Sequence, residues 1–122
     1  MILVDTSVWI DHLHKTIPAL VDALESERVL IHPFVIGELA CGRLMKRDEV
    51  LHLLSTLPPS VVATDAEALE LIEVHHLMDK GIGYFDVRLL AAVMLTEGAE
   101  LWTRDKRLAE IAAGLRIAFA EG

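Results

Sequence analysis

The sequence has few of the features that define several protein classes. It contains one cysteine, so a disulfide framework and a zinc site built from several thiolates are excluded. Aromatic residues make up only 5% of the chain, whereas the apolar set reaches 53%, so the apolar content is mainly aliphatic. A chain this apolar does not belong to the intrinsically disordered class.

Long apolar runs and a basic leader are also missing. No stretch approaches the roughly 20 apolar residues that span a bilayer, and the first residues, MILVD, do not have the pattern of a signal peptide. We therefore expect no contact with a membrane. The lone Cys41 fits a reducing compartment, and we expect a cytoplasmic protein.

Basic residues are outnumbered. Eleven Lys and Arg face nineteen Asp and Glu, for a formal net charge of −8. Nucleic-acid-binding domains usually carry an excess of Lys and Arg on one face, so the overall charge by itself argues against such a partner. Net charge describes the whole chain, however, and a binding site depends on where the charges lie.

Short apolar runs alternate with helical patterns along the chain. With 122 residues we expect a single domain over residues 1–122. Strands joined through helices must run parallel, and parallel sheets are covered on both faces. The pattern therefore predicts an α/β fold with three layers, α/β/α. The strands are expected at 2–4, 29–31, 61–63, 100–103 and 116–119, with helices over 33–45, 48–54, 64–80 and 84–98 among those between them.

Four acidic residues fall where ligands usually bind in such folds, beyond the carboxyl ends of the strands. Asp5 and Asp105 follow expected strands, Asp86 lies in the first turn of a helix, and Glu38 lies one turn inside another. Two unit charges about 5 Å apart repel by roughly 3 kcal/mol at an effective dielectric constant near 20. A shared pocket therefore requires protons, Lys or Arg, or a metal ion, while helix capping is the alternative role for an acid at a helix start.

An all-oxygen ligand set suits Mg²⁺ or Mn²⁺ better than zinc or copper. Such ions lower the pKa of bound water and stabilise charge on a phosphoryl group, which is the chemistry of phosphodiester hydrolysis. We therefore consider a Mg²⁺ or Mn²⁺ site at these four acids.

Four segments resemble the motifs of one family. The chain resembles the PIN-domain family, and in particular the small VapC-type toxin ribonucleases of bacterial toxin–antitoxin systems. The resemblance runs through the whole chain in the order of the family. It rests on VDTSVWI at 4–10, IGELACG at 36–42, GYFDVRLLAA at 83–92 and WTRDKRL at 102–108.

The resemblance implies a fold, an activity and partners. The fold is a PIN domain with a central parallel five-stranded sheet, and the activity is metal-dependent endoribonuclease cleavage of RNA with Mg²⁺ or Mn²⁺. A VapB-type antitoxin and a second copy in a homodimer are the implied protein partners. The implied catalytic and metal-binding residues are Asp5, Glu38, Asp86 and Asp105, supported by the hydroxyl groups of Thr6 and Thr103.

Several basic and aromatic residues lie close in sequence to these acids. The basic residues are candidates for contacts with RNA phosphates, with a solvated surface as the alternative: Arg43, Lys46, Arg47 and Arg104. The first three are spaced i, i+3, i+4, so we expect them to share one helix face one to two turns beyond Glu38. Trp9 is interpreted as either core or dimer surface, and Tyr84 and Phe85 as pocket rim or packing.

Two other functions known in α/β folds need residues that this chain does not have. A phosphatase with a nucleophilic Asp requires a second Asp two residues after the first, where this chain has Ser7. A receiver-type signalling module requires an acid pair at the first strand and a Lys at a late strand, and this chain has neither. The alternative from another class is a catalytically inactive PIN-fold module that binds RNA or protein.

Overall fold

Three parallel strands form the centre of the protein. The structure, a computed structural model, describes residues 1–121. Strand β1 (Ile2–Val4) lies between β2 (Val29–Leu30) and β3 (Glu100–Trp102). In the register, Leu3 lies opposite Leu30 on one side and Leu101 on the other. All three carboxyl ends therefore meet at one edge of the sheet.

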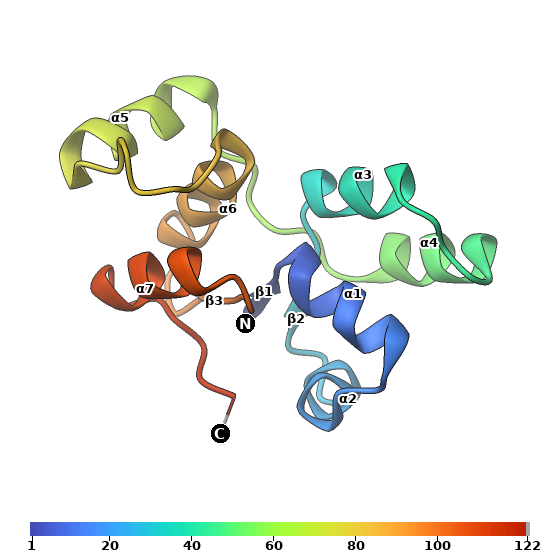
Figure 1. Ribbon diagram of the computed structural model, residues 1–122. Coiled ribbons are helices and arrows are strands. Elements are labelled where there is room, and N and C mark those ends of the chain that lie inside the picture. The colour runs from blue at the N-terminus through green and yellow to red at the C-terminus, as the bar shows by residue number, and fades with distance from the viewer. Residues whose placement is uncertain (122) are drawn as a thin grey trace.

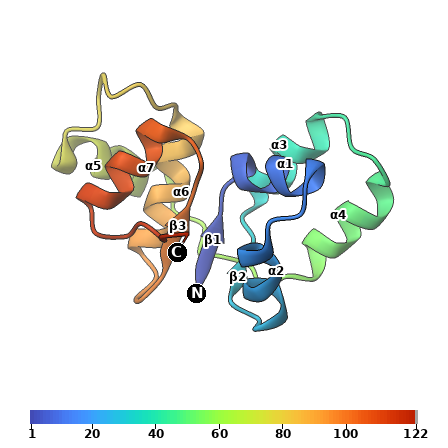
Figure 2. The same cartoon turned by 60° about the horizontal axis from the view of Figure 1, so that its bottom comes forward.

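Seven helices cover the sheet. Figures 1 and 2 show α1 to α4 on one side of the strands and α5 to α7 on the other, so the predicted α/β/α arrangement is confirmed. The helices are α1 (Thr6–His14), α2 (Pro18–Glu25), α3 (Pro33–Cys41), α4 (Arg47–Thr56), α5 (Asp65–His75), α6 (Tyr84–Met94) and α7 (Lys106–Gly114).

The core explains the aliphatic composition. Both faces of β1 are covered, and its three residues are all buried, so the strand is a continuous apolar run without alternation. Trp9 and Trp102 are also buried. Of the two interpretations of Trp9, core packing is therefore the correct one.

The two outer strands of the expected sheet are reduced to single bridges. Ile31 pairs in parallel with Pro59, and Leu101 pairs in parallel with Ala118. These bridges place one segment beyond β2 and another beyond β3, in the order expected of a five-stranded sheet. The strand expected over 61–63 was misplaced, because the bridge forms two residues earlier, next to the Pro58–Pro59 pair.

Several helices end earlier than the sequence predicted. Helix α3 stops at Cys41 because Gly42 is fully extended, and α4 begins only after Lys46, which has a left-handed backbone with φ of 52°. Arg43 and Lys46 therefore lie in a loop, and the prediction that they share a helix face with Arg47 was wrong.

Helix α5 likewise stops at His75, since His76 is left-handed with φ of 53°. The predicted extension to residue 80 does not form. Helix α6 ends at Met94, four residues before the predicted end. None of the helices in the described part of the chain is both long and apolar enough to cross a membrane.

Candidate active site

Asp5 lies at the carboxyl end of the central strand. Its backbone N–H donates to the Trp102 carbonyl at 2.8 Å, which ties it to β3. Asp5 is the N-cap residue of α1, yet its side chain makes no capping hydrogen bond. Instead its Oδ2 accepts from the hydroxyl groups of Ser7 and Thr103, each at 2.7 Å. This buried carboxylate is held by hydroxyls and is not used to cap its helix.

Ser7 is part of the site although the sequence analysis assigned it no role. Its Oγ donates to Asp5, accepts from the Arg104 backbone N–H at 3.0 Å, and lies 3.3 Å from the Thr103 hydroxyl. The signal for it was present, because a serine two residues after an acid at a helix start often bonds locally. Its contact with residue 104 needed the fold.

Glu38 is brought to the same edge by the packing of α3 against α1. The Thr6 hydroxyl donates to Glu38 Oε1 at 2.9 Å, across 32 residues of sequence. Thr6 is thus in direct contact with a predicted site acid, as Thr103 is with Asp5. Glu38 itself is exposed to solvent.

Asp86 and Asp105 each accept a backbone hydrogen bond at a helix start. Asp86 Oδ2 accepts from the Gly83 N–H at 3.3 Å, and Asp105 Oδ1 accepts from the Leu108 N–H at 3.0 Å. The Asp105 N–H also donates to the Thr103 hydroxyl at 3.1 Å. In both acids the capping bond involves only one carboxylate oxygen, so capping and a role in the pocket are compatible.

The electrostatics link all four acids. The pKa of Asp86 is raised above its ordinary value, first by burial and further by the negative charges of Asp5, Asp105 and Glu38, while the Gly83 N–H opposes the change. The three other carboxylates therefore lie close enough to act on Asp86. No salt bridge within residues 1–121 involves any of the four. This edge of the sheet is a pocket of uncompensated negative charge.

A divalent cation fits this donor set in charge and in ligand type. Carboxylate oxygens and an unpaired negative charge are what Mg²⁺ or Mn²⁺ requires. As the side chains stand, no three His, Cys, Asp or Glu residues among 1–121 are grouped closely enough to hold an ion. Binding of an ion would therefore need the carboxylates to move closer together, and the positive charge of the ion would offset the repulsion between them.

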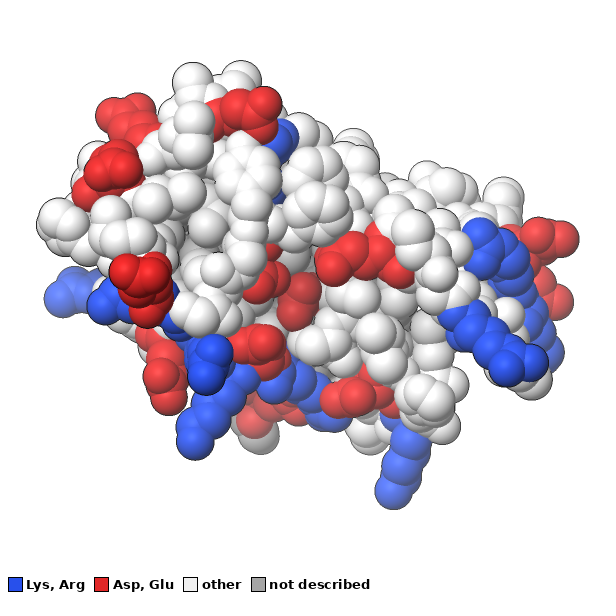
Figure 3. All heavy atoms as spheres, turned by 45° about the horizontal axis from the view of Figure 1, so that its top comes forward, with Lys and Arg blue, Asp and Glu red and all other residues white. Residues whose placement is uncertain are grey.

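Basic residues lie around the acids and not among them. Figure 3 shows acidic side chains gathered in the hollowed middle of one face, with Lys and Arg towards its edges. Arg43, Lys46 and Arg47 are exposed, and Arg47 donates to the Ala40 carbonyl at 2.7 Å at the end of α3. Their contact with RNA stays a prediction.

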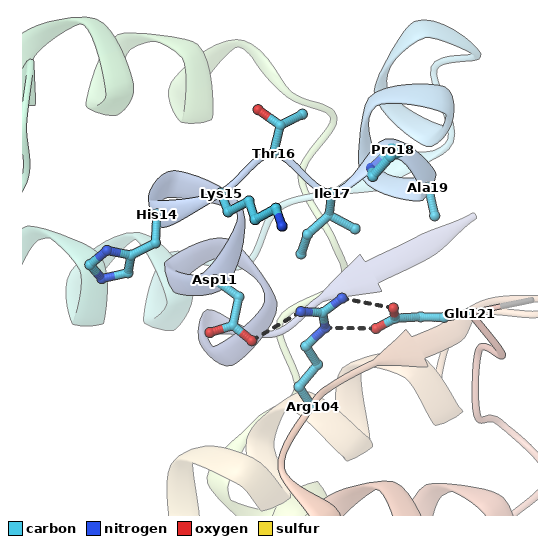
Figure 4. Close-up of a pocket in the computed structure, with 9 residues that line it drawn as sticks. All are labelled: Asp11, His14, Lys15, Thr16, Ile17, Pro18, Ala19, Arg104 and Glu121. Atoms are coloured by element: carbon cyan, nitrogen blue, oxygen red, sulfur yellow. Dashed lines mark hydrogen bonds and ion pairs between the residues drawn. The ribbon is translucent and has the colours of Figure 1, made fainter.

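Arg104 has two carboxylate partners of its own. Its guanidinium bonds Asp11 at 3.1 Å and both oxygens of Glu121, at 2.9 and 2.8 Å (Figure 4). These three residues line a cavity of about 600 Å³ beside α1 and the start of α2. An RNA phosphate at Arg104 would have to compete with Glu121, so a direct contact there also stays a prediction.

Comparison with known proteins agrees with this geometry. The PIN domain matches residues 2–114, and the chain belongs to the PIN-domain family. It is also similar to the protein named Ribonuclease VapC32 from Mycobacterium tuberculosis, in both strain CDC 1551 / Oshkosh and strain ATCC 25618 / H37Rv. Each match is 47% identical over 121 residues and covers 99% of this chain and 98% of the relative.

Proposed function

We propose that this protein is a metal-dependent endoribonuclease and the toxin of a type II toxin–antitoxin system. The observation that carries the proposal is the pocket of four carboxylates without a cation at the carboxyl edge of the sheet. The similarity to Ribonuclease VapC32 supports RNA as the substrate. Cellular RNA lies in the cytoplasm, so this function requires a cytoplasmic location.

The site residues have different roles in the proposed hydrolysis. Asp5, Asp86 and Asp105 would hold Mg²⁺ or Mn²⁺, which when bound activates water and offsets charge on the phosphoryl group. Ser7 and Thr103 fix the orientation of the Asp5 carboxylate through their hydroxyl groups. These hydrogen bonds reduce the reorganisation that binding requires.

Glu38 is positioned by Thr6 at the open side of the pocket. It serves either as a further ligand or as the group that orients the attacking water. In this scheme water attacks the phosphorus directly, so no covalent intermediate and no histidine base are needed.

The protein partners follow from the same proposal. The negative pocket suits the cationic side chain of a VapB-type antitoxin. Ile10 and Leu13 on α1 are exposed and line a small cavity with Arg43 and Met45, which offers apolar contacts to such a partner. A homodimer is also part of the proposal, and light scattering of the purified protein would test it.

Asp5→Asn is the sharpest test of the activity. The amide keeps an oxygen that accepts from Ser7 or Thr103, so the variant folds, but the negative charge at the centre of the pocket is lost. We expect cleavage of RNA in Mn²⁺ or Mg²⁺ to fall by more than about 100-fold, beyond the loss typical of residues that only orient a metal ligand. EDTA should abolish cleavage by the unmodified protein.

Asp11→Asn is the matched control, because Asp11 is an aspartate on the same helix that pairs with Arg104. We expect it to keep activity within about twofold. Full activity of Asp5→Asn, or cleavage that survives EDTA, would refute the proposal. RNA binding without cleavage by the unmodified protein would favour the inactive binding module instead.

A further inference from the structure

Two aromatic rings from helices on opposite sides of the sheet are in contact. Phe34 from α3 and Phe85 from α6 stack with their centroids 4.7 Å apart and their planes tilted by 34°. Figures 1 and 2 show that these helices belong to opposite layers, so the ring pair bridges the two sides of the site. Phe85 remains 50% exposed, and the neighbouring Tyr84 is 38% exposed.

Each ring of the pair lies close in sequence to one of the four acids. Phe34 precedes Glu38 by four residues on α3, and residues four apart share a helix face. Phe85 directly precedes Asp86 in the first turn of α6. The ring pair therefore lies within about one helical turn of two of the four acids, Glu38 on α3 and Asp86 on α6.

The ring of Phe34 is held in place by contacts with two neighbouring side chains. The Arg88 guanidinium carbon lies 4.9 Å from the centroid of Phe34, and the His32 ring packs edge-on against it at 5.0 Å. Arg88 is itself fixed, since it donates to Asp65 Oδ1 at 2.7 Å and to the Ala63 carbonyl. The ring pair of Phe34 and Phe85, called the platform, is thus in place before any ligand binds, which lowers the entropic cost of binding.

Charge decides which part of an RNA binds at this platform. Phosphates are repelled by the carboxylates around the pocket, and the net charge of −8 provides little non-specific attraction. Stacking on an aromatic ring is independent of charge and tolerates any base. We infer that an unpaired nucleobase of the RNA substrate stacks on Phe85, backed by Phe34, and so brings its adjoining phosphate to the acids, whose repulsion a bound Mg²⁺ or Mn²⁺ would offset. This inference rests on the proposed function and adds a base-binding subsite to it.

Binding measured without cleavage tests the subsite. The probe is a single-stranded oligoribonucleotide that carries 2-aminopurine, whose fluorescence is quenched by stacking, and the protein carries Asp5→Asn to prevent cleavage. Adding Phe85→Ala should weaken binding by about tenfold, within the range measured for loss of one stacked base. It should also restore the fluorescence.

Two further variants separate stacking from simple apolar contact. Phe85→Leu keeps a large apolar side chain but loses the aromatic face, so it should behave like Phe85→Ala, whereas Phe85→Tyr should retain both affinity and quenching. Leu53→Ala on α4 is the control of similar exposure and should change neither. Unfolding curves of each variant verify the fold.

Unchanged affinity and quenching in Phe85→Ala would overturn the inference, and so would full binding by Phe85→Leu. If Phe85→Ala instead weakens only the binding of a protein partner, the platform serves that partner and the inference also fails. Failure of the proposed function is seen separately, as the absence of metal-dependent RNA cleavage by the unmodified protein.

Discussion

Carboxylates gather at two places beside α1, and the two places differ in what neutralises them. Asp11 and Glu121 share the guanidinium of Arg104. Asp5 and Asp86 have no Lys or Arg partner within residues 1–121. The first group is an ion-pair network that joins α1 to the end of the chain, and the second is a region of mutual repulsion.

The comparison is informative because Arg104 lies so close to both places. Its backbone N–H donates to Ser7, which binds Asp5, while its guanidinium pairs with Asp11 and Glu121 instead. Arg104, one of the two cations adjacent in sequence to Asp105, thus directs its guanidinium to other carboxylates. A pocket in which carboxylates repel one another without a neighbouring Lys or Arg favours binding of a positively charged ligand.

The largest expected difference between the two places is in their response to metal. A ligand that binds only the folded state at about tenfold above its dissociation constant adds roughly 1.4 kcal/mol of stability. We expect Mn²⁺ to raise the thermal midpoint of the unmodified protein by several degrees. Asp86→Asn should lose most of this rise and Asp11→Asn should keep it, as measured by thermal unfolding with and without Mn²⁺. Equal responses in the two variants would remove the distinction between the regions.

The next effect concerns stability without metal, where the two places should respond with opposite signs. Arg104→Met leaves Asp11 and Glu121 without their cation, and because these groups are partly exposed we expect a loss of about 1 kcal/mol. Asp86→Asn removes repulsion and should leave stability unchanged or slightly higher. Denaturant unfolding in EDTA measures both. A clear destabilisation by Asp86→Asn would show that its capping of α6 outweighs the repulsion.

The smallest effect is in the acid limb of the pH–stability profile. The Arg104 and Trp102 hydrogen bonds hold the pKa of Glu121 below its ordinary 4.5, so its stabilising contribution is lost as the pH falls through that lowered pKa. The pKa of Asp86 is raised above 3.8, mainly by burial, so protonation on acidification favours the folded state.

The two variants should therefore move the profile in opposite directions. Glu121→Gln should make the loss of stability in acid shallower, and Asp86→Asn should make it steeper. Thermal midpoints measured in EDTA from neutral pH down through this acidic range test the signs. Parallel shifts in both variants would contradict them.

Much of the sheet and the site was predictable from local patterns. The predicted strands at 2–4 and 100–103 contain β1 and β3, and β1 is an unbroken apolar run because both of its faces are covered. Helix α5 begins directly after Thr64, at the start of the helix predicted over 64–80, with a capping box formed by Thr64 and Glu67. Helix ends were less predictable, since Lys46 and His76 adopt left-handed backbones that their residue types do not signal.

The role of Phe34 was missed for a similar reason. Phenylalanine at the start of a helix is ordinary packing in any sequence reading, and only the approach of α6 makes it half of a ring pair. Arg104 was predicted to face RNA from its position beside Asp105, whereas its partners Asp11 and Glu121 are distant in sequence. Contacts of this kind depend on how the layers pack.

The sequence by itself determined the α/β class and the parallel sheet, because both follow from the order of apolar runs and helical patterns along the chain. It also predicted the four site acids. Tertiary structure decided which charges meet. It joined Thr6 to Glu38 and Thr103 to Asp5, turned Arg104 towards Glu121, and left the pocket without a cation. Electrostatic energy depends on distance in space, and for these residues that distance is set by the register of the parallel strands and by the packing of helices such as α3 against α1.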